Sequence, residues 1–189
     1  TTEIYTLSLH DALPICLRDW SLTRRDLPST TAAFALSQFR TQVVASDFSL
    51  DLTMTGTQPP ILQGAQGLSR KGPLPEQASY YYSEPQLAVS GALTIQGQRM
   101  AVSAEPAPSN RAWMDHEWSE SLMHPEAVGW DWIGMNLENG GALTVFRLRR
   151  ADGSAVWAGG SYRDNPTDPP QVFAADQVQF TPIRLWTSA

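Results

Sequence analysis

Cysteine and lysine are almost absent from this chain of 189 residues. Cys16 is the single cysteine, which excludes an internal disulfide framework and a cysteine-rich metal site. Lys71 is the single lysine, and 19 acidic residues against 13 basic ones give a formal net charge of −6. Because nucleic-acid binding needs clustered lysine and arginine, this balance argues against a nucleic-acid partner.

Long apolar runs are also missing. No uninterrupted apolar stretch approaches the roughly 18 residues that a membrane-spanning helix needs, so no transmembrane segment is predicted. The chain lacks a Gly-Xaa-Ser-Xaa-Gly elbow, a phosphate-binding loop and a Rossmann fingerprint. Motifs of hydrolase and nucleotide chemistry are therefore absent, and no cofactor is predicted.

The first residues do not read as part of a natural protein. Residues 1–15 resemble the conceptual translation of a common short-read sequencing adapter, and the codon of Cys16 would then be a hybrid. Such segments are set aside before a fold is inferred. We expect residues 1–16 to be an artefactual leader, with the native N-terminus and any signal peptide upstream. The alternative is a natural amphipathic leader.

Alternation of apolar and polar residues with period two dominates the rest of the chain, and no long helical pattern occurs. Turn signals recur about every ten residues, which favours an all-β sandwich or barrel. Sequential hairpins favour an up-and-down antiparallel barrel, because closure removes the exposed edges. The two clearest hairpin turns are Gln96-Gly97 and Asn139-Gly140-Gly141. Strands are predicted over residues 48–54, 80–89, 91–95, 98–103, 112–118, 130–137, 142–149, 155–161 and 178–186.

Two segments interrupt this pattern. Residues 59–77 and 164–170 are rich in glycine and proline, and both are expected to be weakly structured. The second reads as a linker or long loop, so that a second domain would open at Val172. About 170 residues suit one domain, or one domain with part of a second.

A series of aromatic and charged motifs carries a family resemblance. It comprises Tyr80-Tyr81-Tyr82-Ser83, Ala112-Trp113-Met114-Asp115-His116-Glu117-Trp118-Ser119, Gly129-Trp130-Asp131-Trp132, Phe146-Arg147-Leu148-Arg149 with Asp152-Gly153, Gln63-Gly64 and Gly67-Leu68-Ser69. Together these motifs resemble the lipocalin-like family of AttH-type proteins and CrtC-type carotenoid 1,2-hydratases. The resemblance covers nearly all of residues 17–189.

The resemblance implies a lipocalin-like barrel fold with two such halves in the complete protein. The Trp-Trp-Tyr signature of the upstream strands is missing. We therefore expect residues 17–163 to form a partial N-terminal barrel, truncated at its N-terminal side, residues 164–171 a linker or loop, and residues 172–189 the start of the second half. Open barrel edges would favour association. The segment 104–110 is longer than the corresponding family link, and its role stays open.

The strand containing Asp115-His116-Glu117 carries the first candidate site. Because alternate side chains of a strand share a face, His116 and Trp118 are expected to face the barrel interior, with Asp115 and Glu117 on the other side. The resemblance implicates the corresponding histidine and tryptophan in hydration. Histidine can deliver a proton near neutral pH, and an indole face can stabilise a carbocation.

Asp131 is the third candidate catalytic residue. It shares a face with apolar neighbours, where burial would favour the protonated acid. In the alternative, Arg147 or Arg149, across the predicted hairpin, holds it as a carboxylate. The hydratase branch also uses a tyrosine and an aspartate on a later strand, and this chain has Phe146 and Leu148 there.

Aromatic side chains form the candidate ligand-binding surface, and the chain contains seven tryptophans. The alternative roles are ordinary core packing for the aromatic residues and a structural hydrogen-bond network for Asp115-His116-Glu117. Metal binding by His116 with His124 or Glu120 is a further alternative, and no metal site is predicted. The candidate ligand-binding residues are Trp113, Trp130, Trp132, Tyr80, Tyr82 and Phe146.

Three functions compete. The first is the binding of a hydrophobic small molecule, a lipid or terpenoid, in an aromatic-lined barrel. The second is a carotenoid 1,2-hydratase, which adds water to a terminal double bond of an acyclic carotenoid. The third is an envelope accessory protein of a transport system, and the bacterial envelope or periplasm is the favoured location.

Overall fold

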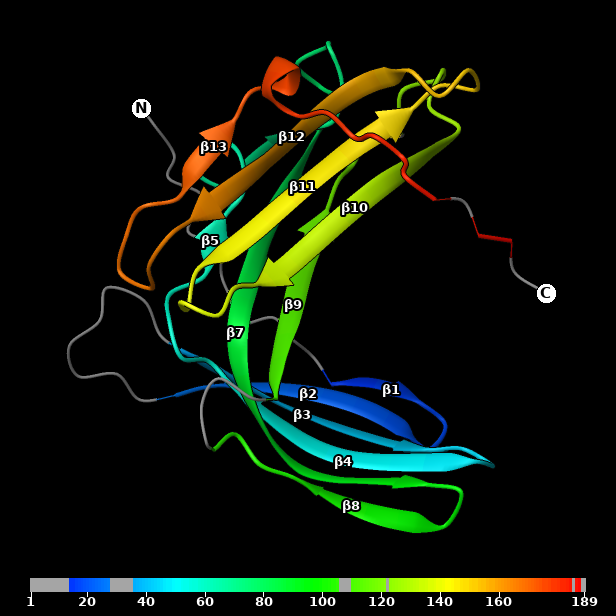
Figure 1. Ribbon diagram of the computed structural model, residues 1–189, viewed down its shortest axis with the longest axis vertical. Helices are drawn as coiled ribbons and strands as arrows, with labels where there is room; N and C mark the ends of the chain where they lie inside the picture. Colours follow the sequence, from blue (N-terminus) through cyan, green and yellow to red (C-terminus); the bar gives the residue numbers. More distant parts are fainter. Residues whose placement is uncertain (1–13, 28–35, 106–109, 122, 185, 188–189) are drawn as a thin grey trace. The chain divides into compact units, whose positions relative to one another are not determined.

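The structure, a computed structural model, describes residues 14–27, 36–105, 110–121, 123–184 and 186–187 (Figure 1). Within these residues the elements are strands, apart from one turn of 3-10 helix, η2 (Ala175–Gln177). All strand pairs with an assigned register are antiparallel. The antiparallel all-β class predicted from the alternating pattern is therefore confirmed. Within these residues, no helix has the length and apolarity needed to cross a membrane.

The chain divides into two compact units that alternate along the sequence. Unit 1 takes its residues from 1–57 and 87–112, and unit 2 from 58–86 and 113–189. The expected domain boundaries at residues 163 and 171 stay a prediction. Most of the expected leader, residues 1–13, lies outside the described residues, whereas Ile15–Leu17 forms the first strand.

Unit 1 is an antiparallel meander in which sequential strands pair along one sheet. Phe39 and Val89 are among its buried residues. The predicted turn at Gln96 and Gly97 is confirmed, because both residues have positive φ and Ile95 pairs with Gln98. The strands are β1 (Ile15–Leu17), β2 (Trp20–Asp26), β3 (Ser37–Val44), β4 (Phe48–Thr55), the second part of β7 (Ala78–Ile95) and β8 (Gln98–Val102).

Strand β7 contributes residues to both units. The sequence predicts two strands here, over residues 80–89 and 91–95, and the structure joins them into one strand of 18 residues. Pro85 and Gln86, with φ of 56° at Gln86, mark the end of the part in unit 2. Gly91 has φ of 134°, and a Cβ atom there would collide with the carbonyl oxygen of Asp51 on β4.

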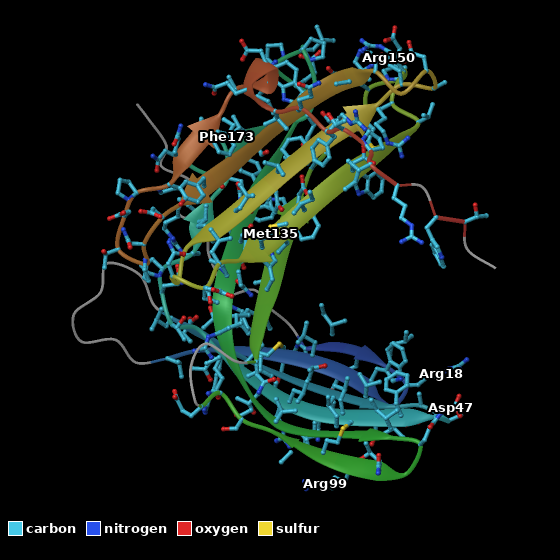
Figure 2. All side chains as sticks on the ribbon, in the orientation of Figure 1. Arg18, Asp47, Arg99, Met135, Arg150 and Phe173 are labelled. Atoms are coloured by element: carbon cyan, nitrogen blue, oxygen red, sulfur yellow. The ribbon has the colours of Figure 1, made fainter. Side chains whose placement is uncertain are left out.

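Unit 2 contains two sheets. The first part of β7 pairs with the short strands β5 (Ile61–Leu62) and β6 (Leu68–Arg70) and with β9 (Arg111–Trp118). The second sheet has the order β10-β11-β12-β13, and Figure 2 labels Met135 on β10 and Phe173 on β13. Its strands are β10 (Gly129–Asn136), β11 (Ala142–Arg149), β12 (Ala155–Arg163) and β13 (Gln171–Phe173).

The strongest predicted hairpin is confirmed in the second sheet. Asn136 pairs with Ala142, and Gly140 adopts φ of 86° in the turn between β10 and β11. Burial then alternates residue by residue along β11. Phe146 and Leu148 lie on its buried face, so this hairpin positions both side chains in the interior of unit 2.

A buried polar cluster joins the two sheets of unit 2. The Gln63 side-chain amide donates hydrogen bonds to Ser83 Oγ at 2.9 Å and to Thr144 Oγ1 at 3.1 Å. Ser161 Oγ donates to Gln63 Oε1 at 2.7 Å. None of these four residues is more than 2% exposed. The polar groups therefore satisfy one another inside the protein, as buried hydrogen-bonding groups must.

The strand predicted over residues 178–186 is wrong. Residues 178–184 and 186 form no strand, and Gln171–Phe173 instead pairs with β12 as β13. Arg147 on β11 explains part of the difference. Its Nη1 donates to the carbonyl oxygen of Phe180 at 3.4 Å, and its guanidinium lies 5.3 Å from the Phe180 ring centroid. These contacts hold the segment against side chains of the sheet.

Candidate functional site

A pocket of about 310 Å³ lies within unit 2. Apolar and aromatic side chains make up most of its wall, and a few polar groups converge on it, which is the usual composition of a small-molecule site. The predicted site residues that line it are Trp118, Trp130, Trp132 and Phe146. Other lining residues were not predicted as site residues, among them Lys71, Ser79, Tyr81, Glu117 and Met123.

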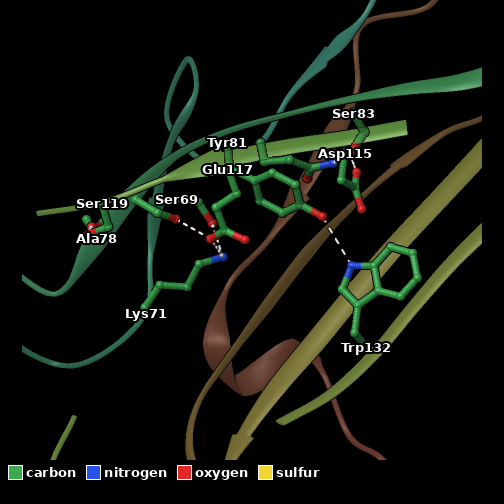
Figure 3. A network of polar contacts seen from close by, with 11 residues as sticks. Ser69, Lys71, Ala78, Tyr81, Ser83, Asp115, Glu117, Ser119 and Trp132 are labelled. Atoms are coloured by element: carbon green, nitrogen blue, oxygen red, sulfur yellow. Dashed lines mark hydrogen bonds and ion pairs between the residues drawn. The ribbon is translucent and has the colours of Figure 1, made fainter. Parts of the chain in front are cut away.

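Strand β9 presents its two carboxylates to the polar residues of β7. Ser83 Oγ donates to Asp115 Oδ1 at 2.5 Å, and Ser79 Oγ donates to Glu117 Oε1 at 2.5 Å. Tyr81 lies between these two serines on the same face of β7. Its hydroxyl accepts a hydrogen bond of 3.1 Å from Trp132 Nε1 in the second sheet (Figure 3). Asp115 and Glu117 therefore lie on the face of β9 that is directed at the serines of β7, and both remain exposed in part.

Of the two residues of β9 that were expected to face the interior, Trp118 lines the pocket and His116 does not. His116 lies on the opposite face of β9 from the carboxylates and stacks on the Tyr82 ring, with centroids 5.4 Å apart and planes at 11°. It is exposed and is not among the residues that line the pocket. The pocket takes one lining residue from each of the two sets that alternation separates on β9, Glu117 and Trp118.

The aromatic residues beside His116 form a continuous stack. The rings of His116 and Trp118 meet edge to face at 5.0 Å, and Trp118 stacks on Tyr80 at 5.4 Å. Tyr80 and Tyr82 are not among the pocket-lining residues. Trp113 does not line the pocket either, but its ring meets Trp132 edge to face at 6.4 Å. Their predicted ligand contacts stay predictions.

Lys71, in the loop after β6, ends at the pocket. Its Nζ lies 2.9 Å from Glu117 Oε1 and donates to Ser69 Oγ at 3.2 Å (Figure 3). The same ammonium lies 4.0 Å from the Phe146 ring centroid and 4.7 Å from that of Tyr81. Burial lowers the pKa of Lys71, and the charge of Glu117 partly opposes that shift.

Burial also shifts two neighbouring acids. The pKa of Tyr81 is raised chiefly by desolvation, so its hydroxyl stays protonated at neutral pH. The pKa of Asp115 is raised by the same cause, while hydrogen bonds from Ser83 and Trp113 act in the opposite direction. Trp113 Nε1 donates to Asp115 Oδ1 at 2.8 Å. The site thus combines aromatic walls with proton-carrying groups near its polar end.

Asp131 belongs to a separate ion-pair cluster. In the register of β10 and β11, Asp131 lies directly opposite Arg147. The Arg147 guanidinium contacts Asp131 Oδ2 at 2.6 and 2.9 Å. Arg149 Nε contacts the other carboxylate oxygen at 3.1 Å. The structure therefore agrees with the alternative in which arginine holds Asp131 as a carboxylate. Asp131 is not a pocket-lining residue, and its catalytic role stays a prediction.

The described residues contain no group of three or more histidine, cysteine, aspartate or glutamate side chains placed to hold a metal ion. His116 stacks between aromatic rings, and Glu117 is paired with Lys71. The polar groups at the pocket are therefore suited to hydrogen bonding and proton transfer with a small molecule.

Comparisons with known proteins agree with this architecture. A family model described as AttH-like matches residues 6–189. The crystal structure of a protein assigned as an AttH from Nitrosomonas europaea is 43% identical, with a TM-score of 0.79, over 93% of this chain and 50% of that chain. The crystal structure of kievitone hydratase from Nectria haematococca is 14% identical, with a TM-score of 0.57, over 85% of this chain and 57% of that chain. No curated protein matches.

The two solved structures support different conclusions about this chain. The chain spans about half the length of the two solved proteins. At 14% identity, the likeness to kievitone hydratase concerns the fold alone. Together with the antiparallel strands, the comparisons confirm the lipocalin-like all-β fold that the motifs predicted.

Proposed function

The chain belongs to the AttH-like family, and from this premise we propose that it binds an apolar small molecule, a lipid or terpenoid, in the pocket of unit 2. The observation that carries the proposal is the aromatic wall. Trp118, Trp130, Trp132 and Phe146 line one pocket although they come from three different strands. The aromatic lining of this pocket is also the reason for assigning an apolar ligand.

The exposure of these aromatic side chains supports a binding role over ordinary core packing. Trp130 is 61% exposed and Trp132 is 42% exposed, whereas the neighbouring Phe146 is only 7% exposed. Large apolar surface left open to solvent is costly, and burying it against a ligand recovers roughly 25 cal/mol per Å². A pocket of about 310 Å³ is at the lower end of the usual range for small-molecule sites.

Binding can be tested with a terpenoid that carries no hydrogen-bond donor. We expect geranyl methyl ether to quench the tryptophan fluorescence of the protein in a saturable manner, because three tryptophans line the pocket. Titration calorimetry gives the dissociation constant independently of the fluorophores. Absence of binding by this ligand and by longer apolar chains in both measurements would refute the proposal.

A matched pair of variants locates the binding site. Met123 lines the pocket and is 47% exposed, so Met123→Trp should fill space there and weaken binding at least tenfold. Val128 is 63% exposed and is not a lining residue, so Val128→Trp should leave the dissociation constant unchanged. Equal effects of the two substitutions would place the ligand elsewhere.

Hydration of a carbon–carbon double bond is the second candidate function. Its support is the position of Asp115 beside the pocket-lining Tyr81, together with the upward shift of its pKa by burial; Asp115 itself does not line the pocket. A protonated carboxyl can give its proton to an alkene carbon, water can then attack the resulting carbocation, and the proton released by that water returns to the carboxylate. Aromatic faces would stabilise the cation. The name of kievitone hydratase, which shares the fold, adds support of a weaker kind.

Mass spectrometry distinguishes hydration with Asp115 as the proton donor from hydration that depends on His116. An acyclic carotenoid incubated with the protein should yield a product heavier by one water. If the carboxyl supplies the proton, Asp115→Asn abolishes the product and His116→Ala does not. The reverse result would support the residues implied by the family resemblance, His116 and Trp118. Recovery of unchanged carotenoid with the unmodified protein would remove hydration as a function.

A further inference from the structure

We infer that the pocket selects ligands that carry a neutral hydroxyl group, with Glu117 Oε2 as the hydrogen-bond acceptor. This inference rests on the proposed binding function and adds the chemistry of the ligand's polar end. Lys71 and Ser79 both contact Oε1 of Glu117. Among the described residues no hydrogen-bond or ion-pair partner contacts Oε2. The Glu117 side chain is 41% exposed and lines the pocket.

Two of the three N–H donors of Lys71 are already engaged. One is directed to Glu117 and one to Ser69, and the ammonium lies against the rings of Phe146 and Tyr81. A ligand therefore meets Lys71 through its charge more than through a free N–H group. Glu117 still has an acceptor atom to offer. An ionised carboxylate has about four acceptor sites, and both contacts of Glu117 are made by Oε1. Oε2 of Glu117 is therefore an acceptor at the polar end of the pocket, to which a ligand can donate a hydrogen bond.

The charges of the pair narrow the ligand class. Lys71 and Glu117 neutralise each other, with their charged atoms 2.9 Å apart. A carboxylate ligand at Oε2 would face the charge of Glu117, and an ammonium ligand would face the charge of Lys71. Like charges at such separations disfavour binding. An alcohol or phenol avoids both penalties, donates its O–H to Glu117, and places its apolar body against Trp130, Trp132 and Leu148.

Three ligands with one carbon skeleton test the inference on the unmodified protein. Geraniol has the hydroxyl donor, geranyl methyl ether lacks it, and geranic acid is anionic at pH 7.5. We expect calorimetry to give a dissociation constant for geraniol about tenfold lower than for the ether, as for one charge-assisted hydrogen bond. Geranic acid should bind more weakly than geraniol.

A variant pair links the preference to one carboxylate. Glu117→Gln replaces the charged acceptor with a neutral one, so the ratio between ether and alcohol should fall about fivefold. Glu126, an exposed carboxylate paired with Arg150 outside the pocket, provides the control, and Glu126→Gln should leave the ratio unchanged. Equal binding of alcohol and ether by the unmodified protein overturns the inference while the proposed function stands. Tighter binding of geranic acid also overturns it, and no binding by any of the three or by longer apolar chains overturns both.

Discussion

Asp131 and Arg147 face each other directly across β10 and β11, and two guanidinium nitrogens of Arg147 contact a single carboxylate oxygen of Asp131. Arg149 contacts the second oxygen. The Arg147 side chain is only 14% exposed, and the same guanidinium also binds the carbonyl oxygen of Phe180. One carboxylate thus balances two arginines and supports the contact that holds the chain near Phe180.

Asp131→Asn is therefore expected to act on stability. Loss of the charge leaves two neighbouring guanidinium groups unbalanced, and the free energy of unfolding should fall by about 1 kcal/mol in urea denaturation. Asp176→Asn, at an exposed position, serves as the control and should be neutral. Ligand affinity should not change, because Asp131 does not line the pocket. Lost ligand binding or turnover at unchanged stability would instead assign Asp131 a direct role in the site.

Lys71 should titrate below the ordinary lysine value of 10.5, because burial lowers its pKa. Between the folded and unfolded pKa values the unfolded chain binds more protons, so this residue makes stability rise as pH increases through that window. Lys71→Met should abolish that rise in urea denaturation series at alkaline pH. As the only lysine, Lys71 also gives one side-chain signal after reductive methylation with labelled formaldehyde. A midpoint at or above 10.5 in that NMR titration would contradict the shift.

Gln63→Leu should disrupt the buried cluster between the two sheets of unit 2. The substitution keeps the approximate size of the side chain but leaves Ser83, Thr144 and Ser161 without their shared partner. The free energy of unfolding should fall by about 2 kcal/mol, as expected when buried polar groups lose their hydrogen bonds. Gln171→Leu, at an exposed position on β13, is the matched control. Equal small effects would show that the cluster adds little to stability.

Gly91→Ala should destabilise unit 1. The residue needs a positive φ, and an added Cβ would meet the carbonyl oxygen of Asp51 on the adjacent strand. A loss of at least about 2 kcal/mol is expected, because both the strained backbone and the collision oppose the substitution. Gly97→Ala also has a positive φ but no atom within 4 Å of the new Cβ, so its smaller effect isolates the collision. Thermal unfolding of both variants gives the comparison.

The elements that the sequence predicts well are those set by local chemistry. Glycine in the turns at Gly97 and Gly140 permits positive φ, and both hairpins are present as expected. The strand predicted over residues 178–186 fails because contacts distant in the sequence decide its conformation. Phe180 binds Arg147, which lies 33 residues earlier. Such contacts leave no periodic signal in the segment itself.

The candidate site is predicted in part for the same reason. Aromatic content points to Trp118, Trp130, Trp132 and Phe146, all of which line the pocket. Lys71 is missed because it lies in the segment 59–77, where no strand periodicity marks an inward side chain. Its one available signal was its status as the single lysine. The contacts of Asp115 and Glu117 involve serines more than 30 residues away, so alternation alone could not identify them.

The alternation of the two units along the chain has a consequence for biosynthesis and for limited proteolysis. Residues 87–112 of unit 1 are enclosed in sequence between the two segments of unit 2. A ribosome therefore translates all the described strands of unit 1 before it reaches β10 to β13, so unit 2 is still incomplete when the last strand of unit 1 has been made. A protease that cuts the chain once cannot release either unit whole, so both must be studied in the uncut polypeptide.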